Sequence, residues 1–238
     1  MTGRIPLLAV AALAASPAAA QLKPEQQTGS HIRAQPTLVP KAEAGAVRKA
    51  FARCMYRSNP AGADALLRNS DPVTINFEGA GIPPKRLQAA LGMSDCLGKQ
   101  AGVNQLALGM KFEDGLLRAM LQEEAYLSVQ KAGVALAPRI PGQRQFVAAP
   151  EKLGVARALA EFADCLAEKN PSAADRLLRT TPGTDEERAA AGTLAPTLGA
   201  CLDQGQTLEF TPILIRAFAA DGLWNRYVAG SPPTQTAR

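Results

Sequence analysis

Four cysteines, Cys54, Cys96, Cys165 and Cys201, are the side chains of this chain best suited to chemistry. An even number of cysteines in an exported protein is typical of disulfides, and four cysteines allow three pairings. None of them has the CxxC spacing of a redox or zinc site, and the single histidine, His31, lies in a region that we expect to be a tail. We therefore expect structural bridges, with no metal and no other cofactor.

Other catalytic constellations are not evident. A nucleophilic hydrolase needs a base beside its serine or cysteine, yet the expected folded part has no histidine and no GxSxG turn. The chain also lacks a glycine-rich phosphate loop. Paired carboxylates for glycoside hydrolysis stay open, with candidates by residue type alone: Glu78, Glu113, Glu123 and Glu124. Because acidic side chains are ordinary on solvated helix faces, the sequence leans towards a protein that is not an enzyme.

An internal repeat contains the cysteines. Residues 51–68 (FARCMYRSNPAGADALLR) return as residues 162–179 (FADCLAEKNPSAADRLLR), with ten of the eighteen positions identical. Later positions also correspond: Cys96-Leu97 with Cys201-Leu202, and Leu117-Arg118-Ala119 with Ile215-Arg216-Ala217. A unit that folded before it was duplicated would carry its own bridge. The repeat therefore predicts the pairs Cys54–Cys96 and Cys165–Cys201.

Apolar spacing predicts about four helices in each unit. Ala, Leu and Val dominate the apolar residues, aromatic residues make up only 5% of the chain, and this composition favours packed helices. Asn59-Pro60 and Asn170-Pro171 have the residue types that cap a helix and occupy its first position. The predicted helices span 43–58, 60–69, 84–100 and 112–130 in the first unit. In the second unit a first helix ends at Asn170-Pro171, and the later helices span 171–180, 185–203 and 212–229.

The two copies diverge after their second helix. The first copy inserts residues 71–84, where Val73, Ile75 and Phe77 alternate as in a short strand. The segments 104–111 and 206–210 are also expected to be extended. The residues that both copies share are those that the fold requires of each copy. A specific function is therefore more readily sought in segments that only one copy has. The 71–84 insertion and the linker 131–150 are such parts.

Basic residues occur at matching points of both copies. Arg68 and Arg179 follow Asp64 and Asp175 by four residues, which predicts a helix-surface ion pair rather than an anion site. Arg118 and Arg216 each interrupt an apolar helix. They could cap backbone carbonyls within each unit, or point into a groove and bind an anion; we retain both as candidate binding residues. Tyr126 and Trp224 also correspond, and are predicted to be core aromatics.

The first twenty residues predict export. A basic residue, Arg4, an apolar run at 5–13 and Ala18-Ala19-Ala20 are typical of a cleaved signal peptide. The run is too short to span a bilayer, and no later segment is apolar enough, so we expect no membrane span. The net charge of +5 comes from interspersed side chains, which argues against nucleic-acid binding. We expect a periplasmic or secreted protein.

The expected organisation is all-α, with two tandem helical repeats and one disulfide within each. A signal peptide (1–20) and a flexible N-terminal tail (21–42) precede the first repeat (43–130). A linker (131–150), the second repeat (151–229) and a disordered tail (230–238) complete the chain.

The cysteine-bearing first helix, the NPxxADxLLR motif, the second Cys-Leu and the closing LRA helix resemble uncharacterised exported proteins of alphaproteobacteria. The resemblance implies an exported, non-enzymatic protein and transfers no catalytic residue. Duplicated helical units present an extended surface, so we expect a binding or interaction protein whose partner is another envelope protein or a cell-wall component. A periplasmic stress chaperone and a cell-wall glycoside-active enzyme are the alternatives.

Overall fold

The computed structural model describes residues 40–104, 113–133, 141–202 and 209–230. The chain divides into a unit Met1–Gln35 and a compact unit Pro36–Arg238, and every described residue belongs to the second. These residues are mainly helical, which confirms the all-α prediction. The predicted signal peptide, nearly all of both tails, and most of the segments 104–111 and 206–210 lie outside the described residues.

The first half of the unit contains five α-helices and one small hairpin. In chain order these are α1 (Lys41–Ser58), α2 (Pro60–Arg68), β1 (Ser70–Asp71), β2 (Thr74–Ile75), a 3₁₀ turn (Pro84–Arg86), α3 (Leu87–Ala90), α4 (Met93–Asn104) and α5 (Asp114–Val129). The second half contains α6 (Pro150–Lys169), α7 (Pro171–Arg179), α8 (Asp185–Gly192), α9 (Ala195–Ala200), α10 (Pro212–Trp224) and a closing π-helical turn (Asn225–Ala229).

Local sequence signals set several helix ends as predicted. The Asn59 side chain accepts a hydrogen bond from the Gly62 amide at 2.9 Å, and Asn170 accepts one from Ala173 at 3.2 Å. In each case proline follows at the first helical position, where its missing N–H costs nothing. The boundaries between α1 and α2, and between α6 and α7, are therefore decided within five residues of chain.

The predicted third helices, 84–100 and 185–203, are each wrong as single helices. The first breaks into the 3₁₀ turn, α3 and α4, with Gly92 at φ +60°, a left-handed conformation that glycine adopts without strain. The second breaks into α8 and α9 around Thr193 and Leu194. Pro196, inside the first turn of α9, lacks an N–H and its ring would clash with a continuing helix.

The inserted segment 71–84 forms less strand than its alternation predicted. β1 pairs with β2 in antiparallel register, Ser70 with Ile75 and Asp71 with Thr74. The Asp71 Oδ1 atom accepts from the amides of Val73 and Thr74, both at 3.0 Å, and so closes a tight turn. This side-chain turn connects the two strands, each of which is two residues long.

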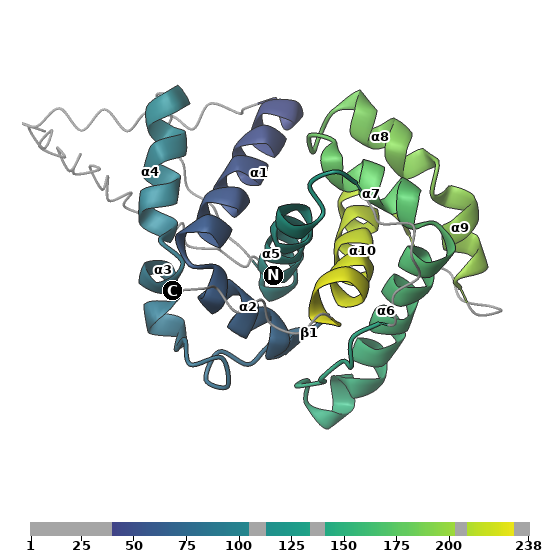
Figure 1. The fold of residues 1–238 in the computed structure, drawn as a ribbon, viewed down its shortest axis with the longest axis horizontal. Helices are drawn as coiled ribbons and strands as arrows, with labels where there is room; N and C mark the ends of the chain where they lie inside the picture. The colour runs from purple at the N-terminus through teal and green to yellow at the C-terminus, as the bar shows by residue number, and fades with distance from the viewer. Residues whose placement is uncertain (1–39, 105–112, 134–140, 203–208, 231–238) are drawn as a thin grey trace, which may run out of the picture. The chain divides into compact units, whose positions relative to one another are not determined.

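Helices α5 and α10 lie side by side at the middle of the unit, with α1 and α2 against α5, and α6 and α7 against α10 (Figure 1). The two hydrophobic cores exchange one aromatic residue each. Tyr126 of α5 packs in the core of the second half, and Trp224 of α10 packs in that of the first. Both rings are buried, as predicted. The α5–α10 pair thus contributes to both cores at once.

Both predicted disulfides are present. Cys54–Cys96 joins α1 to α4, with Cα atoms 5.6 Å apart, and Cys165–Cys201 joins α6 to the residue after α9, with Cα atoms 5.8 Å apart. Each bridge stays within its own half of the unit. The bridges thereby attach α4, and the residue that follows α9, to the longest helix of their half.

Candidate functional site

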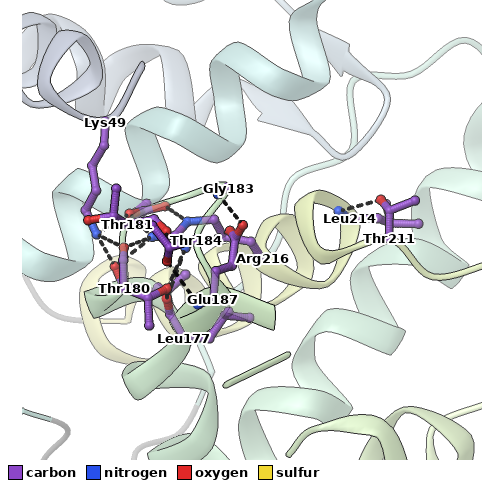
Figure 2. A network of polar contacts seen from close by, with 12 residues as sticks. Lys49, Leu177, Thr180, Thr181, Gly183, Thr184, Glu187, Thr211, Leu214 and Arg216 are labelled. Carbon is purple, nitrogen blue, oxygen red and sulfur yellow. Dashed lines mark hydrogen bonds and ion pairs between the residues drawn. The ribbon is translucent and has the colours of Figure 1, made fainter. Parts of the chain in front are cut away.

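Arg216 of α10 lies at the centre of a buried polar network (Figure 2). Its guanidinium donates to both carboxylate oxygens of Glu123 on α5, at 2.7 and 2.8 Å, and to Glu187 of α8 at 3.0 Å. It also donates to three backbone carbonyls at the end of α7: Leu177, Leu178 and Thr180. Burial by itself lowers the Arg216 pKa, but the bonds to Glu123 raise it above its usual value. Arg216 therefore performs the carbonyl-capping role that was one of its two predicted alternatives.

Lys49 of α1 reaches the same carbonyls from the other half. Its Nζ atom donates to the Thr180 carbonyl at 2.6 Å (Figure 2). It also donates to the Leu178 carbonyl at 2.5 Å and lies 3.3 Å from Glu123. Burial lowers the Lys49 pKa, and the positive charge of Arg216 lowers it further. The end of α7 is thus held by one cation from each half.

Arg118 of α5 occupies a second buried network. It donates to Asp221 of α10 at 2.8 Å and to the Ser70 hydroxyl at 2.9 Å. Arg144, from the segment before α6, also donates to Asp221, at 3.0 Å, and joins it to Asp164 of α6. Burial raises the Asp221 pKa, but the two guanidinium groups outweigh it and hold the pKa below its usual range.

The two networks are reciprocal. Residues 118 and 216 lie 98 positions apart, as do 123 and 221, and each arginine pairs with the acid of the other helix. A weaker pair of contacts is also reciprocal between the two halves: Arg68 donates to the Ala229 carbonyl at 3.5 Å, and Arg179 to the Lys131 carbonyl at 3.4 Å. In the described residues, the donors of Arg118 and Arg216 are directed to groups within the protein; anion binding by them stays a prediction.

The predicted Asp–Arg pairs on α2 and α7 differ. Asp175 and Arg179 form the expected ion pair at 2.8 Å, and the Tyr126 hydroxyl also donates to Asp175 at 2.8 Å. On α2, Arg68 turns to the Ala229 carbonyl, and the Oδ1 atom of Asp64 is buried without a hydrogen-bond partner among the described residues. Burial raises the Asp64 pKa, although Arg68 opposes this shift.

The 71–84 insertion and the 131–150 linker, the segments that only one copy has, meet at Asp71. Its Oδ2 atom accepts from the amides of Val147 at 2.7 Å and Ala148 at 2.6 Å, in the linker before α6. The inserted hairpin therefore holds the linker through one carboxylate. A functional role for either segment stays a prediction.

Of the four carboxylate candidates, Glu78 and Glu113 are exposed, whereas Glu123 and Glu124 are buried on α5. Glu123 is committed to Arg216 and Lys49. Glu124 accepts only from Arg53 of α1, at 3.2 Å, and its Oε1 atom has no partner among the described residues. Burial raises the Glu124 pKa, and Arg53 only partly offsets this.

Glu124 lies in the wall of an open cleft of about 870 Å³, which is bordered by α1, the end of α5 and the end of α7. We call it the cationic cleft because five basic side chains line it: Lys49, Arg53, Arg57, Lys131 and Arg179. Lys49, Arg53 and Arg179 have acidic partners. Arg57 and Lys131 are exposed, and neither forms an ion pair within the described part of the chain.

The basic α1 wall of the cleft is specific to the first half. Arg53 and Arg57, one turn apart on α1, correspond in the internal repeat to Asp164 and Glu168 of α6. Those acids are bound internally, Asp164 by Arg144 at 2.6 Å and Glu168 by Arg226 at 3.2 Å. The prediction from the sequence did not include Arg53 or Arg57 and missed the cleft. The reversal of charge between Arg53 and Arg57 and the matching acids Asp164 and Glu168 is the sequence signal that could have indicated the cleft.

The described residues contain no group of three or more His, Cys, Asp or Glu side chains that could hold a metal ion. Within the same residues, no helix is both long and apolar enough to cross a membrane. The chain matches no family model, no curated protein and no solved structure.

Proposed function

We propose that this chain is an exported, non-enzymatic binding protein of the cell envelope, and that it binds an anionic envelope component in the cationic cleft. The observation that carries this proposal is the pair Arg57 and Lys131, two exposed cations without ion-pair partners in the described residues, on the walls of an 870 Å³ cleft. Five of the six charged side chains that line the cleft are cations, and a concave surface with an excess of one charge sign attracts ligands of the other.

Export is part of the same proposal. Two disulfides are typical of an oxidising compartment, and the first twenty residues have the composition of a signal peptide. The expected resemblance to exported alphaproteobacterial proteins would fit this location. An anionic ligand in the envelope is then a cell-wall or surface component, or an acidic protein, rather than nucleic acid.

We further propose that the two halves are tandem repeats that arose by duplication. The reciprocal ion pairs Arg118–Asp221 and Arg216–Glu123, and the exchange of Tyr126 and Trp224 between cores, support this reading. In a dimer with two-fold symmetry, a residue i of one subunit contacts residue j of the other, and residue j of the first subunit contacts residue i of the second. The unit has the contact pattern of such a dimer joined into one chain.

The proposal is tested by calorimetric titration at low salt with polygalacturonate, an acidic polysaccharide, and with neutral dextran. The wild type should bind only the acidic polymer, with affinity that falls as salt rises. The double variant Arg57→Ala/Lys131→Ala should weaken binding about tenfold, since two charge contacts are removed. Arg176→Ala, which removes an exposed cation of α7 outside the cleft, is the matched control. Equal weakening in both variants would indicate general charge attraction and contradict the cleft.

One observation favours the glycoside-active alternative. Glu124 is a buried carboxyl with a raised pKa in the wall of the cleft, which is the property of a general acid. An enzyme would release soluble fragments from purified cell wall, and Glu124→Gln would abolish the release. Binding of the acidic polymer without release by the wild type would exclude this alternative. No feature of the described residues specifically favours the stress-chaperone alternative.

A further inference from the structure

The basic surface of α1 continues beyond the cationic cleft. A second hollow, of about 430 Å³, shares Ala50, Arg53 and Arg57 with the cleft and adds Lys99 of α4. We call it the Lys99 hollow. Arg53 and Arg57, one helical turn apart, line both the cleft and the hollow, and we call this pair the Arg53–Arg57 ridge. Among the described residues, none that lines the Lys99 hollow is acidic.

Lys99 is placed there by a covalent bond. The disulfide Cys54–Cys96 fixes α4 to α1, Cys54 itself lines the hollow, and Lys99 follows Cys96 by one turn of α4. Lys99 is exposed and forms no ion pair among the described residues. Three cations, Arg57, Lys99 and Lys131, are therefore available on a surface that runs from α4 over α1 to the end of α5.

We propose that the Lys99 hollow is a second anion subsite, and that the ligand is a linear acidic polysaccharide which crosses the Arg53–Arg57 ridge. This inference rests on the proposed function. Two hollows of like charge separated by a shared ridge suit a chain with repeated anionic groups better than a single small anion. Tyr56, Ser128 and Thr181 also line the cleft, and the Ser128 hydroxyl donates within α5 to the Ala125 carbonyl at 2.7 Å. Hydroxyl donors and acceptors, with one aromatic face, suit sugar rings.

Chain length is the property that tests the second subsite. Digalacturonate can fill one hollow, whereas octagalacturonate can reach both, and linking two sites makes the second binding event intramolecular. Calorimetric titration of the wild type should therefore give at least about tenfold tighter binding for the octamer than for the dimer. An eight-unit polyphosphate distinguishes a phosphate polymer from a uronate polysaccharide.

Single variants separate the two hollows. Lys99→Ala should weaken binding of the octamer about threefold or more and leave the dimer unchanged. Lys131→Ala, in the cleft only, should weaken both. Lys152→Ala, an exposed cation of α6, should change neither. The double variant Cys54→Ala/Cys96→Ala, if folded, should lose the octamer preference, because α4 is no longer fixed to α1.

Three different outcomes would refute the second subsite, the polysaccharide ligand and the proposed function, respectively. Unchanged octamer binding in Lys99→Ala, with both ligands weakened in Lys131→Ala, refutes the second subsite and leaves the cleft in place. Tighter binding of polyphosphate than of octagalacturonate refutes the polysaccharide assignment. A wild type that binds none of these polyanions refutes the proposed function itself.

Discussion

Arg118 of α5 and Asp221 of α10 form a buried ion pair with Nη2 and Oδ1 2.8 Å apart, and Arg216 and Glu123 form the reverse pair between the same two helices. Each helix therefore presents one arginine and one acid to its neighbour. Burying an ion pair gains little free energy over apolar packing, but breaking one is costly. We infer that these pairs set the register of α5 on α10 more than they add to stability.

Removing the acid of this network is expected to destabilise the fold strongly. Asp221→Asn would leave the charges of Arg118 and Arg144 without their shared carboxylate, which should lower the free energy of unfolding by about 3–5 kcal/mol. Urea denaturation followed by the fluorescence of Trp224, the only tryptophan, measures this. Asp185→Asn, in an exposed pair with Arg188, is the control and should change little. An equal loss in the free energy of unfolding for Asp221→Asn and Asp185→Asn would contradict the inference that breaking a buried ion pair costs more than breaking an exposed one.

Asp221 should also contribute to acid sensitivity. Its pKa in the folded protein is depressed by Arg118 and Arg144, so the stabilisation is complete above its ordinary value of 3.8 and is lost as pH falls below it. In denaturation series between pH 7 and pH 2.5, the wild type should lose stability at the acid end. Asp221→Asn should lack that component, and a parallel decline in both proteins would assign the acid sensitivity to other carboxylates.

Glu124 should act in the opposite direction. Burial raises its pKa in the folded protein, so its contribution is most favourable below its ordinary value of 4.5 and is lost as pH rises through the folded pKa. Glu124→Gln keeps an oxygen for Arg53 and removes the titration. It should be more stable than the wild type at pH 7, with the difference shrinking towards pH 4. A constant difference across this range would mean that Glu124 does not titrate abnormally.

A close approach of α6 and α10 makes Gly222 indispensable. A Cβ atom there would lie 2.0 Å from the Ala163 carbonyl oxygen, which cannot move without displacing α6. Gly222→Ala should destabilise the fold by about 3 kcal/mol. Gly154→Ala, on an exposed part of α6 with no atom near the new Cβ, should instead stabilise by about 0.5–1 kcal/mol. Thermal unfolding of the two variants gives opposite shifts of Tm if the backbone contact is as described.

The disulfides should contribute similarly because they close loops of similar length, 42 and 36 residues. Chain entropy assigns about 4 kcal/mol to each. Cys54→Ala/Cys96→Ala and Cys165→Ala/Cys201→Ala should therefore lower the free energy of unfolding by comparable amounts in urea denaturation. A much smaller loss for one pair would show that its half retains structure in the unfolded state.

The amino-acid sequence by itself determined the features that depend on a few neighbouring residues. Asn59 and Asn170 with their prolines set two helix boundaries, and the internal repeat selected one disulfide pairing out of three. Tyr126 and Trp224 were correctly identified as core residues. These features follow from local capping, from apolar spacing and from the similarity of the two copies, all of which are written along the chain.

The tertiary structure alone decided which residues meet across the two halves. Nothing in the sequence indicated that Arg118 would pair with Asp221, or that Lys49 and Arg216 would share the carbonyls of α7. The cationic cleft also appeared only when α1, α5 and α7 were assembled. Such contacts depend on how α5 docks against α10. That docking is fixed by the sum of many weak packing and charge interactions between distant segments, so no local pattern encodes it.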